Sequence, residues 1–174
     1  SWFVIFVLIT MSLTTQYRSD HPQWSLFEHI VFGVSTSLLF FGSVVLHELG
    51  HSVIALQFGI PVRSITLFVF GGVAQIGKEP QRPSHEFAIA IAGPVVSALL
   101  AAVFYVLREG THGLFEGLSD LSGWLGRINL TLALFNLIPG FPLDGGRVLR
   151  SLVWQYTRSF ERATRIASGS GQFF

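Results

Sequence analysis

The 174-residue chain contains no cysteine and carries few charged side chains. Without cysteine, neither a disulfide framework nor a zinc site with thiolate ligands can form, so histidine and carboxylate groups must supply any metal ligands. Charged residues make up 12% of the chain, whereas ordinary soluble domains carry about 25%. The net charge of +1 gives no indication of a nucleic-acid partner. The shortage of charge argues against an ordinary soluble domain.

Half of the residues are hydrophobic, and they are concentrated in long runs. A helix crosses a bilayer with about 17 to 25 mainly apolar residues, and several of these runs approach or reach that length. We therefore expect an all-α, multi-pass integral membrane protein, a transmembrane helix bundle with about four spans. The stretch 64–76 is too short to span, is rich in β-formers and is split by Gly71-Gly72, which predicts a small membrane-associated β-hairpin.

The expected elements follow one another in a single unit, 1–174. They are a first span (1–17), a second span (25–58), the β-hairpin (64–76), a third span (86–107), a fourth span (121–146) and an amphipathic helix (147–160). Ser84 is a candidate N-cap for the third span, and 108–122 is expected to be a Gly-rich loop. Small residues recur in the third span, a pattern that lets membrane helices approach closely. Both ends of the chain lie in or beside apolar segments, so we expect a core fragment of a longer protein.

The sequence His47-Glu48-Leu49-Gly50-His51 lies near the C-terminal end of the second span. Positions i and i+4 share one face of a helix, so both imidazoles can reach one metal ion, and Glu48 can approach a water bound to it. This is the H-E-x-x-H arrangement of zinc hydrolases. The structural alternative is a buried polar cluster without a metal. That alternative is weakened by the setting, because ionisable groups inside a span are costly and usually functional.

A catalytic zinc ion usually has three protein ligands and a water, so a third ligand is needed. Four candidates lie near the same membrane face: Glu79, His85, Glu86 and Asp144. Asp144 lies in an apolar, turn-rich stretch where a carboxylate needs a counter-charge, which Zn2+ would supply. The alternative for Asp144 is a helix-capping residue in an ordinary turn.

The basic residues predict the orientation in the membrane. The ends of the second and fourth spans face the same side, which would hold eight basic residues: Arg63, Lys78, Arg82, Arg147, Arg150, Arg158, Arg162 and Arg165. The opposite side would hold Arg18, Arg108 and Arg127. The positive-inside tendency therefore places the first side, and with it the metal motif, at the cytoplasm. The motif would lie about 10 Å below that membrane surface, at about 1.5 Å per helical residue.

Three motifs together resemble the site-2 protease family of intramembrane zinc metalloproteases: HELGH at 47–51, AGP at 92–94 and NLIPGFPLDGGR at 136–147. The family's three-helix catalytic core is similar to the second, third and fourth spans. The hairpin sequence ITLFVFGGVA at 65–74 resembles bacterial and archaeal members, including a subgroup with C-terminal CBS domains, a module that these 174 residues do not include.

The resemblance implies that His47, His51 and Asp144 bind one zinc ion per chain and that Glu48 is the general base. It also implies that Asn136 positions the substrate or stabilises the oxyanion, although an interhelical hydrogen bond explains an asparagine there equally well. The implied activity is hydrolysis of a peptide bond in or near the transmembrane segment of membrane-anchored regulatory proteins. The expected partners are such a substrate and the lipid bilayer, with a second copy of the chain as a further candidate.

The sequence is also compatible with two other functions. A catalytically inactive homologue would bind membrane helices without cleaving them. A divalent metal transporter would also place histidine and aspartate in its spans, but it would need polar sites along a whole route, and the first and third spans offer almost none. Histidine-rich ligation favours zinc over other divalent ions without excluding them.

Overall fold

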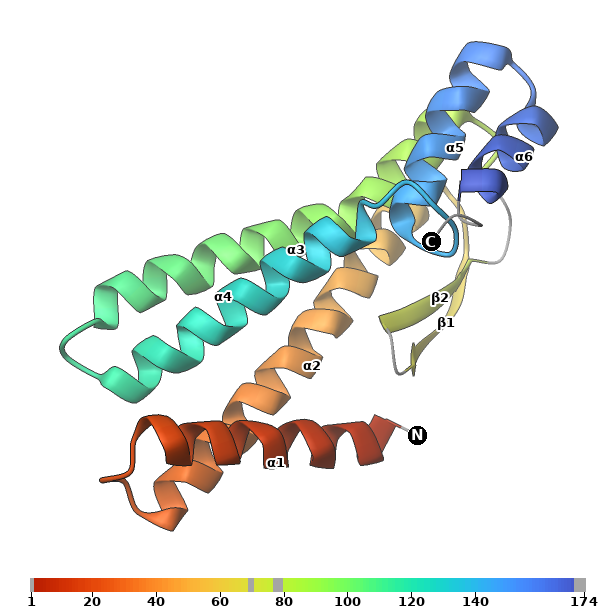
Figure 1. Cartoon of the computed structure of the whole chain (residues 1–174). Helices are drawn as coiled ribbons and strands as arrows, with labels where there is room; N and C mark the ends of the chain where they lie inside the picture. The colour runs from red at the N-terminus through yellow and green to blue at the C-terminus, as the bar shows by residue number, and fades with distance from the viewer. Residues whose placement is uncertain (1, 69–70, 77–79, 171–174) are drawn as a thin grey trace.

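The computed structural model describes residues 2–68, 71–76 and 80–170. Among these residues, the structure contains six helices and one two-stranded sheet (Figure 1). The elements are α1 (Trp2–Asp20), α2 (Leu26–Gln57), β1 (Val62–Phe68), β2 (Gly71–Ile76), α3 (Pro83–Thr111), α4 (Glu116–Asn136), α5 (Asp144–Thr157) and α6 (Phe160–Ser170). The structure is thus nearly all helical.

Helix α3 is the central element, because it packs against α2, α4 and α5 (Figure 1). Helix α4 runs back along α3, and α1 crosses the N-terminal part of α2. The C-terminal end of α2, the N-terminal end of α3, the C-terminal end of α4 and the start of α5 therefore lie at one end of the molecule. This convergence brings the part of α2 that carries His47 and His51 close to Asp144 at the start of α5.

Helix α2 has well-defined ends. Ser25 is its N-cap: the Ser25 hydroxyl accepts from the backbone N–H of Glu28, and the Glu28 carboxylate accepts from the backbone N–H of Ser25. This reciprocal capping box satisfies backbone donors that a helix otherwise leaves free. At the other end, the helix gives way to Phe58 and Gly59, and Gly59 has a φ of 71°, a left-handed conformation that favours glycine.

By length and hydropathy, α2 and α3 are the two candidate membrane spans among the described residues. Helices α1 and α4 have 19 and 21 residues and more polar sequences. The expectation of about four spans stays a prediction, as does the place of the other helices relative to the bilayer.

Strands β1 and β2 pair antiparallel, with Thr66 opposite Val73 and Phe68 opposite Gly71. The register shifts between Val62 and Ile65, and the sheet lies against α2. Strand β1 begins two residues before the stretch 64–76 in which the sequence predicts two strands, and β2 lies within it. The connecting residues 69–70, and the predicted ligand candidate Glu79, lie outside the described residues. The position of the sheet relative to the membrane stays a prediction.

Several helix boundaries differ from those expected. Arg82, not Ser84, is the N-cap of α3, and its guanidinium cannot cap the helix because it has no acceptor. Pro83 follows at the first helical position with its φ already suited to a helix. The expected loop 108–122 is shorter, since α3 continues to Thr111 and α4 begins at Glu116. The expected fourth span 121–146 ends as a helix at Asn136. Helix α6 was not expected.

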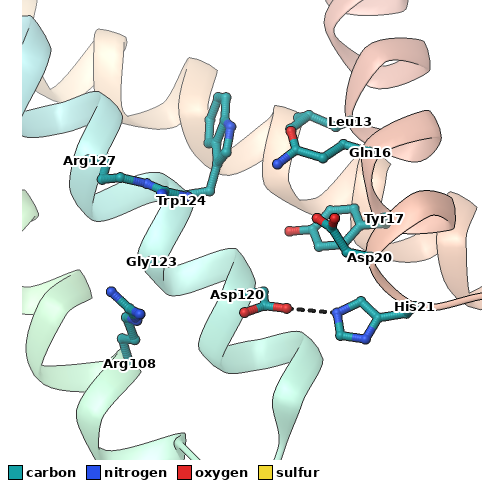
Figure 2. A pocket seen from close by; sticks show the side chains of 10 residues that line it. All are labelled: Leu13, Gln16, Tyr17, Asp20, His21, Arg108, Asp120, Gly123, Trp124 and Arg127. Atoms are coloured by element: carbon teal, nitrogen blue, oxygen red, sulfur yellow. Dashed lines mark hydrogen bonds and ion pairs between the residues drawn. The ribbon is translucent and has the colours of Figure 1, made fainter.

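A polar cavity of about 260 Å3 lies between α1, α3 and α4, at the opposite end of α4 from the convergence (Figure 2). Its charged lining comes from Asp20, Arg108, Asp120 and Arg127. His21 bonds Asp120 at 2.7 Å, which ties the end of α1 to α4. None of the residues predicted for catalysis or metal binding lines this cavity.

Candidate metal centre

His47 and His51 of α2 meet Asp144, the first residue of α5. Oδ2 of Asp144 lies 3.2 Å from Nε2 of His47 and 3.1 Å from Nε2 of His51, and the two Nε2 atoms are 3.2 Å apart. Both histidines are buried, and the Asp144 side chain is largely buried. The structure therefore brings together three potential ligand atoms from positions 93 and 97 residues apart in sequence.

The spacing of these atoms fits a small divalent ion. A tetrahedral zinc site with bonds of about 2.0 to 2.1 Å places neighbouring ligand atoms about 3.3 Å apart. The three separations of 3.1 to 3.2 Å are close to that edge length. Without a cation, a carboxylate oxygen and two imidazole nitrogens would crowd their lone pairs unless an imidazole were protonated. Two histidines and one carboxylate also form a donor set known from catalytic zinc sites.

Helix α3 orients both imidazole rings. Nδ1 of His51 donates to the backbone carbonyl of Ile89 at 2.7 Å, and a carbonyl can only accept. The proton of a neutral His51 is therefore on Nδ1, which leaves the lone pair of Nε2 for a metal. Nδ1 of His47 is 2.9 Å from the hydroxyl of Ser97, which can accept in the same way. Outer hydrogen bonds of this kind fix the tautomer and orientation of metal-binding histidines.

Gly93 of α3 forms the wall of the site beside the two rings. A Cβ atom at this position would lie 2.2 Å from Nε2 of His51 and 2.6 Å from Nε2 of His47. No larger residue can occupy the position without displacing the potential ligand atoms, because both distances are below van der Waals contact. The AGP sequence at 92–94 thus has a direct steric role at the centre.

Glu48 is buried on α2 beside His47. Arg147, in the first turn of α5, is partly buried near the acidic groups of the site. Burial lowers the pKa of Arg147, whereas the negative charges of Asp144, Glu86 and Glu48 raise it. Asn136, at the end of α4, donates from Nδ2 to the carbonyl of Leu132 at 3.0 Å in its own helix. The role predicted for Asn136 toward substrate stays a prediction.

The other two described candidates for the third ligand are held elsewhere. The ring of His85 stacks on Phe58 with centroids 4.0 Å apart and planes 4° apart. The Glu86 carboxylate accepts from Nε of Arg150 at 2.7 Å. Neither belongs to the group of potential ligands that includes Asp144.

Sequence reasoning missed the contributions of Ile89, Gly93 and Ser97 to the site. A sequence pattern includes two of them, because Gly93 and Ser97 belong to the recurring small residues of the third span. That pattern indicates close helix packing but not which histidine lies opposite. The Ile89 contact uses a backbone oxygen, so no side-chain pattern could have revealed it.

An apolar helical fold with a buried His-His-Asp group and an adjacent glutamate defines a metal-dependent hydrolase of the H-E-x-x-H type. The family model of Peptidase family M50 matches residues 35–113 and 109–174. The chain therefore belongs to peptidase family M50, the site-2 protease family, whose curated members related to this chain include several named as zinc metalloproteases.

Three relatives illustrate the match. A Synechocystis sp. protein that carries the name of a zinc metalloprotease, sll0528, is 49% identical over 174 residues, which is 100% of this chain and 45% of that protein. Zinc metalloprotease MJ0392 of Methanocaldococcus jannaschii is 35% identical over 98% of this chain and 46% of its own length. The solved structure of the site-2 protease from Methanocaldococcus jannaschii has a TM-score of 0.65 and 36% identity, covering 95% of this chain and 69% of that one. The chain spans about half the length of the curated relatives it matches.

Proposed function

We propose that the chain is the catalytic core of an intramembrane zinc metalloprotease that cleaves membrane-anchored regulatory proteins in or near their transmembrane segment. The observation that supports this most directly is the convergence of His47, His51 and Asp144 within 3.2 Å of one another, with Glu48 beside them on the same helix. A zinc ion held by these residues would supply Lewis-acid activation of water and of the scissile carbonyl.

The chain's own residues would perform the proton transfers. Glu48 takes the proton from the attacking water and later gives it to the leaving amine, so one carboxylate acts first as base and then as acid. The hydrogen bonds from His47 and His51 to α3 keep both Nδ1 protons away from the reaction. Asn136 is the proposed donor to the oxyanion or to the substrate backbone.

Substrate binding requires an extended segment, because the hydrogen bonds of a helix shield its carbonyl groups. The sheet formed by β1 and β2 lies against α2, the helix that carries the motif, and a sheet edge can accept a peptide as an additional strand. We infer that the substrate pairs along the region 66–74. Proline removes a backbone donor, so proline substitutions along these strands should reduce cleavage. Cleavage that is unchanged by every such substitution would exclude strand pairing.

The proposed enzyme is a multi-pass membrane protein with its active site near the cytoplasmic side. The distribution of basic residues supports this orientation, because eight of the eleven fall on the side of the metal centre. Water and the unfolded part of the substrate would then reach the site from the cytoplasm. The bilayer and a membrane-spanning substrate are the proposed partners, and association with a second copy is compatible with them.

The decisive test is Glu48→Gln in the purified, zinc-loaded protein with a membrane-protein substrate in vesicles. We expect zinc to remain bound, because the three ligands are unchanged, and cleavage to fall by about 100-fold or more, because general acid–base catalysis contributes about 100- to 10,000-fold. Glu109→Gln is the matched control, since Glu109 is an exposed glutamate of α3 remote from the motif. It should cleave like the unaltered chain.

The same experiment separates the alternatives. Undiminished cleavage by the Glu48→Gln protein would exclude Glu48 as the base. A zinc-loaded, unaltered chain that cleaves no substrate of the family would favour the inactive homologue. Zinc uptake into protein-containing vesicles, abolished by His51→Ala, would favour a transporter.

A further inference from the structure

Glu86 is a fully buried carboxylate outside the group of potential metal ligands. Its exposed fraction is 0%, and one of its oxygens, Oε1, accepts from both Nε and Nη2 of Arg150. The other oxygen, Oε2, has no hydrogen-bond partner among the described residues. Glu86 lies in the first turn of α3, whereas Arg150 lies in the middle of α5. The ion pair therefore joins the helix that supports the histidines to the helix that carries Asp144.

We propose that the Glu86–Arg150 ion pair is a positioning pair that fixes the third metal ligand, Asp144, relative to the two histidines. This inference deepens the proposed function and rests on it, because it assigns a role toward the same metal centre. Neither residue touches the reacting atoms, so both act through the placement of α5.

The geometry of α5 explains how the pair acts at a distance. Arg150 follows Asp144 by six residues, which is about 9 Å along a helix at about 1.5 Å per residue. A helix of this length is stiff, so its orientation at Arg150 also sets the position of its first residue. At the other end, the backbone of Gly145 packs against the carbonyl oxygens of Leu137 and Ile138. The N-terminal half of α5, which begins with Asp144, is thus held by a steric contact at Gly145 and an ionic contact at Arg150.

Arg150 also holds the segment that leads into α5. Its guanidinium carbon lies 5.2 Å from the ring centroid of Phe141 and 4.8 Å from that of Phe160. Phe141 belongs to the turn between α4 and α5, and Phe160 begins α6. A guanidinium over aromatic rings is attracted to them, and a planar fork fits a carboxylate better than a lysine ammonium does. One side chain therefore connects α3, the turn and α6.

Helix α3 contacts both histidines directly and the helix of Asp144 through one ion pair. Ser97 of α3 contacts His47, Ile89 contacts His51, and Glu86 contacts the helix of Asp144 through Arg150. Together with Gly93, these positions are spaced by three, four and four residues, so they follow one side of α3. A buried ion pair adds little stability compared with apolar residues of the same size, so fixing one geometry is the better explanation for it.

The test measures metal binding in the full chain by competition with a chelator, and coordination by the visible absorption spectrum of the Co2+-loaded protein. Arg150→Gln should weaken zinc binding by about 10-fold, within the 10- to 100-fold range for residues that support metal ligands, and should alter the Co2+ spectrum. Arg150→Lys keeps the charge but loses the fork, and should recover part of the affinity. The matched control is Arg165→Gln, an exposed arginine of α6, which should bind both metals like the unaltered chain.

A second variant keeps the test decisive if a buried, unpaired Glu86 prevents folding. Glu86→Gln with Arg150→Gln leaves no unpaired charge at this pair and should show the same loss of zinc affinity in a folded protein. Zinc affinity and a Co2+ spectrum that match the unaltered chain, in either folded variant, would overturn the positioning role. An unaltered chain that binds zinc with neither histidine involved would instead overturn the proposed function on which it rests.

Discussion

The candidate metal centre requires glycine at position 93, because a side chain there would collide with both imidazole rings. Gly93 leaves room for the imidazole nitrogens of His47 and His51, and the backbone and side chains of α3 on either side orient the rings. These three positions, Ile89, Gly93 and Ser97, are each about one helical turn apart. Changes of one or two atoms are therefore expected to act on metal binding before they act on folding.

Gly93→Ala should abolish high-affinity zinc binding. The added methyl group would lie 2.2 Å from Nε2 of His51, so the ring must move away from its partners. Zinc titration of the purified protein measures the effect. Gly110→Ala in the same helix is the control, since no heavy atom lies within 4 Å of its Cβ position, and it should bind zinc normally. Normal zinc affinity in the Gly93 variant would show that the ion binds elsewhere.

Ser97→Ala should lower zinc affinity by about 10-fold, because loss of an outer hydrogen bond to a metal-binding histidine typically costs about 10- to 100-fold. The variant removes the partner of Nδ1 of His47, which lies 2.9 Å away. Ser43→Ala is the comparison: Ser43 is also buried, but it accepts from Asn129. Equal affinities for the two variants would argue that Ser97 has only a packing role.

At the scale of elements, the start of α5 determines the site, because its first residue is Asp144. Gly145 and Gly146 allow this helix to lie directly against the backbone of the preceding turn; a Cβ atom on Gly146 would be 2.6 Å from the carbonyl carbon of Gly140. Two adjacent glycines weaken a helix, so their presence in its first turn follows from the close approach rather than from helix propensity.

Gly145→Ala should therefore displace α5 and weaken zinc binding without changing any ligand. Its methyl group would lie 2.2 Å from the carbonyl oxygen of Ile138. Gly169→Ala in α6 meets nothing within 4 Å and should be neutral or slightly stabilising. The contrast can be measured as the zinc dissociation constants of the two proteins. If both bind alike, the turn can move without disturbing Asp144.

Some elements could be predicted from the sequence, and others depended on packing. The predicted second span, 25–58, is close to α2, because a long apolar run is a local feature of the sequence. The start of α5 was predicted three residues too late, because Asp144-Gly145-Gly146 has the composition of a turn and only its fit against Leu137 and Ile138 makes it helical. Asp144 could be favoured among four candidates by its apolar, turn-rich setting and by the family resemblance. The ion pair of Glu86 could not be predicted, since its partner Arg150 is 64 residues away in the sequence.

For the whole molecule, the candidate metal centre joins the first and second halves of the chain, because it combines His47 and His51 with Asp144. A ligand that binds the folded state stabilises it, by about 2.7 kcal/mol at a free concentration of 100 times its dissociation constant. Zinc removal by a chelator should therefore lower the melting temperature of the unaltered protein, and zinc should restore it. His51→Ala should melt at the same temperature with and without zinc. Equal zinc-dependent shifts in both proteins would place the stabilising ion at another site.

The absence of cysteine permits a direct test of the orientation. His112, between α3 and α4, and Glu161, in α6, are both exposed in the structure. Each can be replaced by a single cysteine. In sealed cells, a membrane-impermeant thiol reagent should label the first from outside and the second only after permeabilisation. Labelling of both from the same side would contradict the predicted topology.

The distance in sequence between the two histidines and Asp144 also has a consequence for biosynthesis. When His51 has left the ribosome, 93 residues remain to be made before the carboxylate 3.1 Å from it exists. During that interval the nascent chain already carries the motif in an apolar helix but has no complete ligand set. The proposed metal site can therefore be completed only after the C-terminal part of the chain has been made and has docked, so a nascent chain that carries the histidines alone would lack the proposed activity.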